Sequence, residues 1–100
     1  MEQPPFLFST RGSKELATKI ADHYGQELGN LKIVEFSDGE FTPAFEQPIR
    51  GARVFLIGST HQPTDNLMEL LLMCDAAKRA SAKSITAVIP YYGFARQDRK

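Results

Sequence analysis

The sequence predicts an α/β domain built on a doubly wound, mainly parallel sheet with helices on both faces. Two observations lead to this prediction. Short apolar runs alternate along the chain with segments whose apolar residues recur at helical spacing, which is typical of parallel strands joined by helices. In addition, residues 54–57 are apolar without alternation, as in a strand that is covered on both faces. We expect residues 1–100 to form one small domain.

The first third of the chain predicts a strand, a helix and a second strand. The first strand covers residues 6–8. Ser13 can cap the helix that follows, whose apolar stripe runs on to Leu28, and Gly29 is expected to end it. The second strand covers residues 31–36. This order predicts a βαβ unit with parallel strands and a right-handed crossover.

The next segment predicts a short β excursion at about residues 37–52. A turn at 37–40 opens it, and Pro43 and Pro48 interrupt it, so we expect an irregular, hairpin-like path. The chain then enters the apolar strand at 54–57.

A long helix is predicted from about Asp65 to Ala80. Thr64 can cap it, or Asn66 and Glu69 can form a capping box. Its residues 67–74 are apolar almost all the way round, whereas a surface helix would carry one apolar stripe. We therefore expect this helix to be buried on two sides, against its own sheet and against another chain or domain. A last strand is predicted at residues 85–89.

The net charge is zero, but it is unevenly distributed. Residues 1–77 carry six basic and eleven acidic groups, a net charge of −5, whereas residues 78–100 carry six basic and one acidic group, a net charge of +5. This concentration favours a local anion site over a nucleic-acid surface, which would need a basic stripe across the fold. No nucleic-acid partner is expected.

The sequence also argues against secretion and against a membrane partner. Residues 1–5 lack the basic start and apolar run of a signal peptide, and no stretch is long and apolar enough to cross a bilayer. Cys74 is the only cysteine, so it is expected to be a small buried hydrophobe in a reducing compartment. We expect a cytoplasmic location.

The most informative stretch is residues 90–100, Pro-Tyr-Tyr-Gly-Phe-Ala-Arg-Gln-Asp-Arg-Lys. It follows the last predicted strand, and open α/β sheets bind ligands at the carboxyl ends of their strands. Arg96 and Arg99 offer bidentate donors to phosphate, Lys100 offers a mobile charge, and Gln97 can bind a base or sugar edge. The stretch predicts half of a phosphate or nucleotide site, although a solvated charged tail remains the alternative.

A second candidate is the turn Phe36-Ser37-Asp38-Gly39-Glu40. Its aromatic ring and two carboxylates could stack on a purine and accept bonds from its amino group. On these residues alone a structural turn is the stronger interpretation, because an Asp-Gly turn after a strand is common. His61 has no second His, Cys or carboxylate at metal-ligand spacing and is expected to be a loop histidine, and His23, on the polar side of the first helix, is expected at the surface. No glycine-rich nucleotide motif or zinc pattern is present.

Four segments together closely resemble the ribose-phosphate pyrophosphokinase family, in the family's order and spacing. They are Phe36 to Glu40, residues 65–71 (Asp-Asn-Leu-Met-Glu-Leu-Leu), residues 79–82 (Arg-Ala-Ser-Ala) and residues 90–100. The resemblance implies the first half of a phosphoribosyltransferase-like (flavodoxin-like) fold. It also implies a reaction, in which ATP donates its pyrophosphoryl group to the 1-hydroxyl of ribose 5-phosphate, giving phosphoribosyl pyrophosphate and AMP for nucleotide biosynthesis.

The resemblance further implies the residues and partners of that reaction. ATP would be bound by Phe36, Asp38, Gly39 and Glu40 of one subunit and by Arg96, Gln97, Arg99 and Lys100 of its neighbour. Magnesium (Mg²⁺) would accompany ATP, with protein ligands outside this chain. The family's enzymes are homo-oligomers, usually hexamers. Arg50, Ala80 and Ser81 match parts of a regulatory site for phosphate or ADP, but Pro48 stands where the family commonly has Ser.

Other features depart from the family and keep alternatives open. The family's enzymes are roughly three times longer and have two similar α/β halves, so this chain would be an amino-terminal portion without the metal ligands, the catalytic loop or the ribose 5-phosphate site. On its own it is expected to be inactive. A non-catalytic regulatory subunit of the same family is the alternative. A flavodoxin-like or receiver-like signalling domain is disfavoured, because residues 9–12 supply neither a flavin loop nor an acidic cluster.

Overall fold

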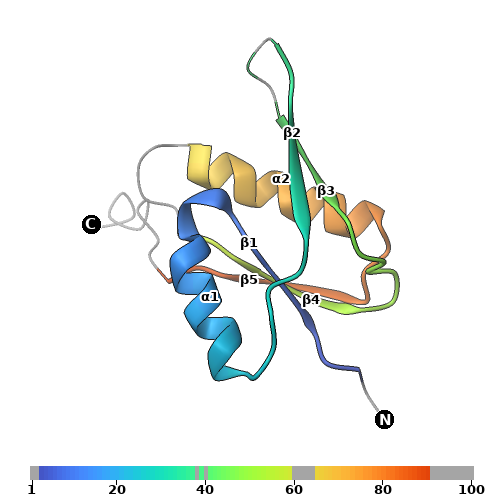
Figure 1. The fold of residues 1–100 in the computed structure, drawn as a ribbon. Helices are drawn as coiled ribbons and strands as arrows, with labels where there is room; N and C mark the ends of the chain where they lie inside the picture. The colour runs from blue at the N-terminus through green and yellow to red at the C-terminus, as the bar shows by residue number, and fades with distance from the viewer. Residues whose placement is uncertain (1–2, 38, 40, 60–64, 91–100) are drawn as a thin grey trace, which may run out of the picture.

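The computed structural model describes residues 3–37, 39, 41–59 and 65–90, which form a parallel sheet flanked by two helices and a separate hairpin (Figure 1). The elements in chain order are β1 (Phe6–Ser9), a 3₁₀ turn (Arg11–Ser13), α1 (Lys14–His23), β2 (Leu31–Glu35), β3 (Phe41–Phe45), β4 (Arg53–Ile57), α2 (Asp65–Arg79) and β5 (Ser84–Val88).

The three-stranded sheet is parallel, with the strand order β1-β4-β5. Phe6 of β1 pairs with Val54 of β4, and Arg53 of β4 pairs with Ser84 of β5. The central strand β4 is the unalternating apolar run, and it is covered on both faces as predicted. The mainly parallel α/β architecture expected from the sequence is therefore confirmed.

Each face of this sheet is covered by one helix, because successive residues of a strand point to opposite faces. Phe8 points to the α2 face, where it belongs to the same cluster as Leu56 and Met73. Leu7 points to the other face and packs with Ala17 of α1. All of these apolar side chains are buried, so two small cores, one on each face, hold the helices against the sheet.

The predicted βαβ unit at the start of the chain is wrong. β2 does not join β1 but pairs antiparallel with β3 in a two-stranded sheet. A central strand of a parallel sheet must be apolar on both faces, whereas β2 carries the exposed charges of Lys32 and Glu35. Pro43 of β3 also suits only an edge, because it has no N–H to donate. The crossover unit is instead β4–α2–β5, and the β excursion starts at residue 31, not at about 37.

The sequence predicts that the first helix ends at Gly29. In the structure it ends more than a turn earlier, at His23. The N–H of Gln26 donates to the carbonyl of Ala21, and the N–H of Gly25 donates to that of Asp22, each at 3.0 Å. This is a Schellman termination, which requires the left-handed φ of +73° found at Gly25. Gly29 has another role: a Cβ there would lie 2.4 Å from the ring of Phe8.

The helix start also differs from the prediction. Ser13 occupies the N-cap position of α1 but makes no side-chain capping bond. Its hydroxyl instead accepts a hydrogen bond of 3.0 Å from the N–H of Ser59, just after β4. Ser13 is buried, so this bond ties the start of α1 to the end of the central strand.

The long helix α2 follows its prediction closely. Its inner face, which includes Leu70, Met73 and Ala77, is buried against the sheet. Met68 and Leu71 on the outer face are 48% and 53% exposed. Cys74 is half-buried, and burial raises the pKa of its thiol. Within the described ranges, neither helix is long and apolar enough to cross a bilayer.

The predicted caps of α2 stay predictions, because Thr64 and the side chain of Asn66 lie outside the described residues. Both carboxylate oxygens of Glu69, the other residue of the predicted capping box, accept hydrogen bonds from Arg11.

Candidate functional site

The turn between β2 and β3 lies at the end of a hairpin that extends beyond α2, away from the parallel sheet (Figure 1). The carbonyl of Phe36 accepts a 3.0 Å hydrogen bond from the N–H of Gly39, whose φ is +91°. A turn of this shape favours glycine at that position. Asp38 and Glu40, which the sequence placed in the same site, lie outside the described residues.

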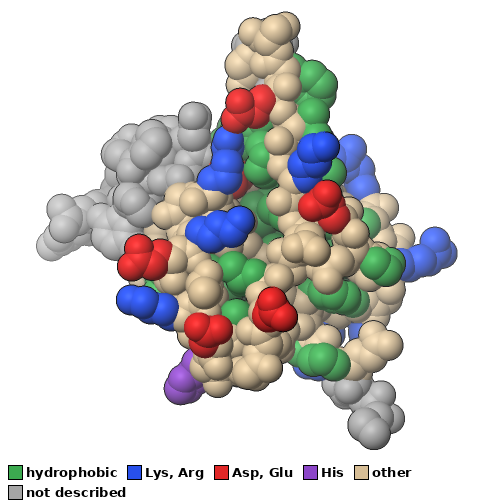
Figure 2. Space-filling view, in the orientation of Figure 1, with side chains coloured by type: hydrophobic (Ala, Val, Ile, Leu, Met, Phe, Trp, Pro, Cys, Tyr) green, Lys and Arg blue, Asp and Glu red, His purple; other side chains and the backbone are tan. Residues whose placement is uncertain are grey.

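Phe36, directly after β2, is 52% exposed. In the space-filling view the projecting hairpin carries hydrophobic surface (Figure 2). The ring is therefore available to stack on a planar ligand or to contact another molecule.

The second predicted cluster, Arg96, Gln97, Arg99 and Lys100, lies outside the described residues. The structure describes the chain that leads to this cluster as far as Pro90. Because β1, β4 and β5 are parallel, their carboxyl ends share one edge of the sheet. The chain leaves β5 at this edge, which is where open α/β sheets hold ligands.

Sequence reasoning missed Arg11, which connects three elements near the hairpin. Its backbone N–H and its Nε donate to the two carboxylate oxygens of Glu69, at 2.7 and 3.0 Å. Its Nη1 donates to Glu35 at 2.6 Å, and its guanidinium lies 5.0 Å from the ring centre of Phe41. Only the position of an arginine just after a strand could have indicated this role.

The electrostatics of Arg11 follow from these contacts. Partial burial lowers the pKa of the guanidinium, but the hydrogen bonds to Glu69 and Glu35 raise it by more, so the pKa lies above its ordinary value. Arg11 therefore carries a full positive charge at any physiological pH. Glu69, which is only 3% exposed, obtains its neutralising charge from this residue.

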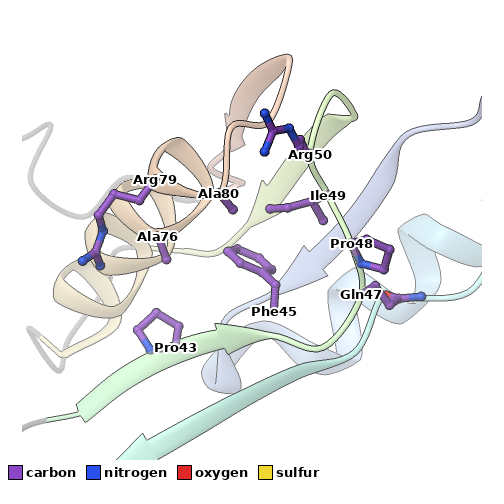
Figure 3. Close-up of a pocket in the computed structure, with 9 residues that line it drawn as sticks. All are labelled: Pro43, Phe45, Gln47, Pro48, Ile49, Arg50, Ala76, Arg79 and Ala80. Carbon is purple, nitrogen blue, oxygen red and sulfur yellow. The ribbon is translucent and has the colours of Figure 1, made fainter.

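A hollow of about 430 Å³ lies between α2 and the segment that joins β3 to β4 (Figure 3). Arg50 and Ala80, two of the three predicted regulatory residues, both line it, as does Pro48. Ser81 does not, but its carbonyl accepts a 2.9 Å hydrogen bond from the N–H of Gly51, which joins the two segments behind the hollow. Ser81 has a left-handed φ of +64°.

The hollow also contains Arg79, which the sequence did not single out. Its Nη2 lies 3.1 Å from Asp75 one turn earlier on α2. Across the described part of the chain, Arg50 makes no ion pair, so its charge is uncompensated by a neighbouring carboxylate. Phe45 and Ile49 supply the apolar floor (Figure 3). Arg50 and Arg79 lie at opposite ends of this floor (Figure 3), and the guanidinium of Arg50 suits a small anion with an apolar or planar part.

The described residues do not fit a metal ion. They contain no group of three His, Cys, Asp or Glu side chains that could hold one. Two carboxylates, that of Glu35 at the end of β2 and that of Glu69 on α2, are both engaged by Arg11.

Comparison with known proteins agrees with this architecture. Residues 6–100 match the family described as the N-terminal domain of ribose phosphate pyrophosphokinase. The chain belongs to this family. The parallel sheet and the hairpin are therefore the architecture of the amino-terminal domain in this family. Its members are transferases of nucleotide biosynthesis.

Individual relatives give the same result. The chain is 60% identical over 94 residues to a ribose-phosphate pyrophosphokinase of Porphyromonas gingivalis, covering 94% of this chain and 30% of the relative. It is 55% identical over 100 residues to that of Chlorobaculum tepidum, covering 100% of this chain and 31% of the relative. The chain thus spans a little under a third of the length of these relatives.

A solved structure confirms the fold. The phosphoribosylpyrophosphate synthetase of Mycobacterium smegmatis matches with a TM-score of 0.89 at 38% identity, covering 98% of this chain and 33% of that one. None of the three proteins is named as a regulatory subunit, and nothing in the comparisons favours that alternative.

Proposed function

We propose that residues 1–100 form the amino-terminal α/β domain of an enzyme that transfers the pyrophosphoryl group of ATP to the 1-hydroxyl of ribose 5-phosphate. The single observation that carries this proposal is the family match over residues 6–100, at identities of up to 60% to proteins named for this activity. Phosphoribosyl pyrophosphate and AMP are the products.

The β2–β3 turn is proposed to bind the adenine of ATP. Phe36 would stack on the base, with Asp38 and Glu40 accepting bonds from its amino group and Gly39 shaping the turn. The exposure of the Phe36 ring and the left-handed backbone of Gly39 support this assignment. The ring has no role in either core of the domain, so its position is not required for packing.

The basic segment after β5 is proposed to bind the phosphates of ATP. Arg96 and Arg99 would supply bidentate donors, Lys100 a point charge and Gln97 a polar contact. Its support is the carboxyl edge of the parallel sheet, from which the chain departs toward this segment.

The two clusters are proposed to meet across a subunit interface in a homo-oligomer, a hexamer by resemblance to the family, located in the cytoplasm. The hairpin supports this arrangement, because its outer end projects beyond α2 (Figure 1) and the ring of Phe36, just after β2, is exposed. A turn that leaves its own domain can complete a neighbour's site at little cost to its own core.

Magnesium (Mg²⁺) is proposed to accompany ATP, where it would neutralise charge on the phosphate oxygens. Since the described residues contain no set of ligands for a metal ion, its protein ligands are proposed to lie elsewhere in the enzyme.

The hollow at Arg50 is proposed as the regulatory site for phosphate or ADP, with Ala80 in its lining and Ser81 directly after it in the chain. Arg50, which makes no ion pair among the described residues, supports anion binding. Pro48 cannot donate a hydrogen bond where the family commonly has a serine hydroxyl, so phosphate should bind more weakly here than in the family's usual site.

The shared ATP site is tested with the full-length gene product that contains these residues. Arg96→Ala should lower kcat/KM for ATP by about one to two decades, because a charge-assisted bidentate contact contributes about 1.5–3 kcal/mol. Arg96→Lys should recover only part of this loss. Phe36→Ala should raise the KM for ATP. The isolated 100-residue chain serves as the blank, with no AMP formed.

Mixed oligomers then decide whether the two clusters belong to different subunits. Co-assembled Arg96→Ala and Phe36→Ala subunits should regain activity, since some interfaces pair an intact Arg96 with an intact Phe36. Absence of any recovery over either variant alone would show that both residues serve one subunit's pocket.

A further inference from the structure

We infer that Arg11 is a positioning residue for the nucleotide-binding turn, acting as a clamp between the domain and the outer end of the β2–β3 hairpin. This inference rests on the proposed function, because it assumes that the turn after Glu35 binds ATP. The clamp consists of Arg11 and the three side chains that it contacts, Glu69, Glu35 and Phe41.

One arm of the clamp is anchored in the body of the protein. Glu69 lies on α2 and is almost fully buried, and both of its oxygens are held by Arg11, one by the backbone N–H and one by Nε. A carboxylate in this setting has a strong preference for its ionic partner, because water cannot replace it. The guanidinium is therefore held in one orientation, from which its Nη1 reaches Glu35.

The other arm of the clamp reaches the hairpin at the last pair of residues before its turn. Glu35 is the last residue of β2 and Phe41 the first of β3, and the two are directly paired in the ladder. Arg11 donates to the carboxylate of Glu35 and lies over the ring of Phe41. It thus contacts both residues of the one rung on which the Phe36–Glu40 turn is built.

The hairpin needs such a contact because its two ends are supported differently. At the inner end, Phe45 packs edge-on against the buried ring of Phe8, with 4.6 Å between the ring centres. Pro43 in the middle is buried too. Beyond it, an isolated two-stranded ribbon is only marginally stable in water. The Arg11 clamp supports this outer half, which belongs to neither apolar cluster of the described residues.

The consequence for ATP is a difference in pre-organisation. A clamped rung holds the start and the end of the turn at fixed positions, so less conformational freedom is lost when a base stacks on it. Releasing the rung should weaken ATP binding without changing the reacting groups. The expected signature is a higher KM for ATP with an unchanged kcat and an unchanged KM for ribose 5-phosphate.

The test cuts only the hairpin arm, in the full-length gene product that contains these residues. Glu35→Ala leaves the Arg11–Glu69 pair intact, so the fold is not put at risk by an unpaired buried carboxylate. It should raise the KM for ATP about threefold to fivefold, the upper range for an exposed ion pair. Glu35→Gln keeps an oxygen that can accept the Arg11 bond and should recover part of the loss.

Lys32→Ala is the matched control, since Lys32 is an exposed charged residue of the same strand whose side chain makes no hydrogen bond or ion pair in the described part of the chain. It should leave the KM for ATP unchanged. Amide hydrogen exchange, measured without ATP, should be faster over residues 34–36 and 41–42 in Glu35→Ala than in Lys32→Ala.

Equal exchange and an equal KM for ATP in the two alanine variants would overturn the clamp. A wild-type protein that uses no ATP would instead contradict the proposed function, and the exchange comparison would still decide whether Arg11 holds the hairpin.

Discussion

Thr10, the residue that follows β1, carries a fully buried hydroxyl that has no hydrogen-bond partner among the described residues. The side chain packs against the backbone of Gly58, where an added Cβ would lie 2.7 Å from its Cγ2 atom. Glycine at position 58 therefore makes room for Thr10, whereas the hydroxyl itself contributes no bond.

An unpaired buried hydroxyl carries a desolvation penalty, so Thr10→Val should stabilise the fold by about 1 kcal/mol. Valine has nearly the same shape and suits the extended backbone at this position. Urea unfolding would measure the change, with Thr10→Ser as the control that keeps the hydroxyl and loses the packed methyl group. A valine variant less stable than wild type would mean that the hydroxyl has a partner after all.

Among the elements, α1 has an end that depends on one residue. Gly25 adopts a left-handed φ of +73°, and its N–H and that of Gln26 satisfy the last carbonyls of the helix. No atom lies within 4 Å of the position that a Cβ at Gly25 would occupy. The demand for glycine is therefore purely conformational.

Gly25→Ala should destabilise the protein by about 1 kcal/mol, because alanine in the left-handed region is strained. Gly25→Asn should cost less, since asparagine tolerates this backbone better than alanine. Both values come from the shift in the midpoint of urea unfolding. Equal losses in the two variants would argue that the end of the helix is set by something other than backbone strain.

At the scale of the whole molecule, the outer face of α2 leaves apolar side chains in water. Met68 and Leu71 lie one turn apart and are about half exposed. Burying such a side chain against a partner contributes about 1.5–3 kcal/mol. We therefore expect the chain to self-associate through this face, as the all-round apolar pattern of α2 suggested.

Sedimentation velocity should detect dimers or larger species of the chain at high concentration, and Leu71→Asp should shift them toward the monomer. Lys78→Asp on the same helix is the control, because it changes charge at an exposed polar position. A stable monomer at every concentration would contradict this expectation.

Much of the architecture is determined by local sequence. The strands at 6–9, 53–57 and 84–88 and the helix at 65–79 match their predicted places within a residue or two. This succeeds because burial on one or both faces imposes a spacing on apolar residues that can be recognised within each segment. The family is likewise determined by the sequence, since its motifs keep their order and spacing.

Only the tertiary structure decided which strands pair and which distant side chains meet. β2 was predicted as a strand, but not its antiparallel pairing with β3. The position beside β1 is occupied by β4, whose two faces are both apolar. Arg11 and Glu69 are 58 residues apart, and their contact exists because β1 ends close to the place where α2 begins. Local spacing reports whether a face is buried. It carries no information on which other segment buries it, because that choice is made by the complementarity of whole surfaces.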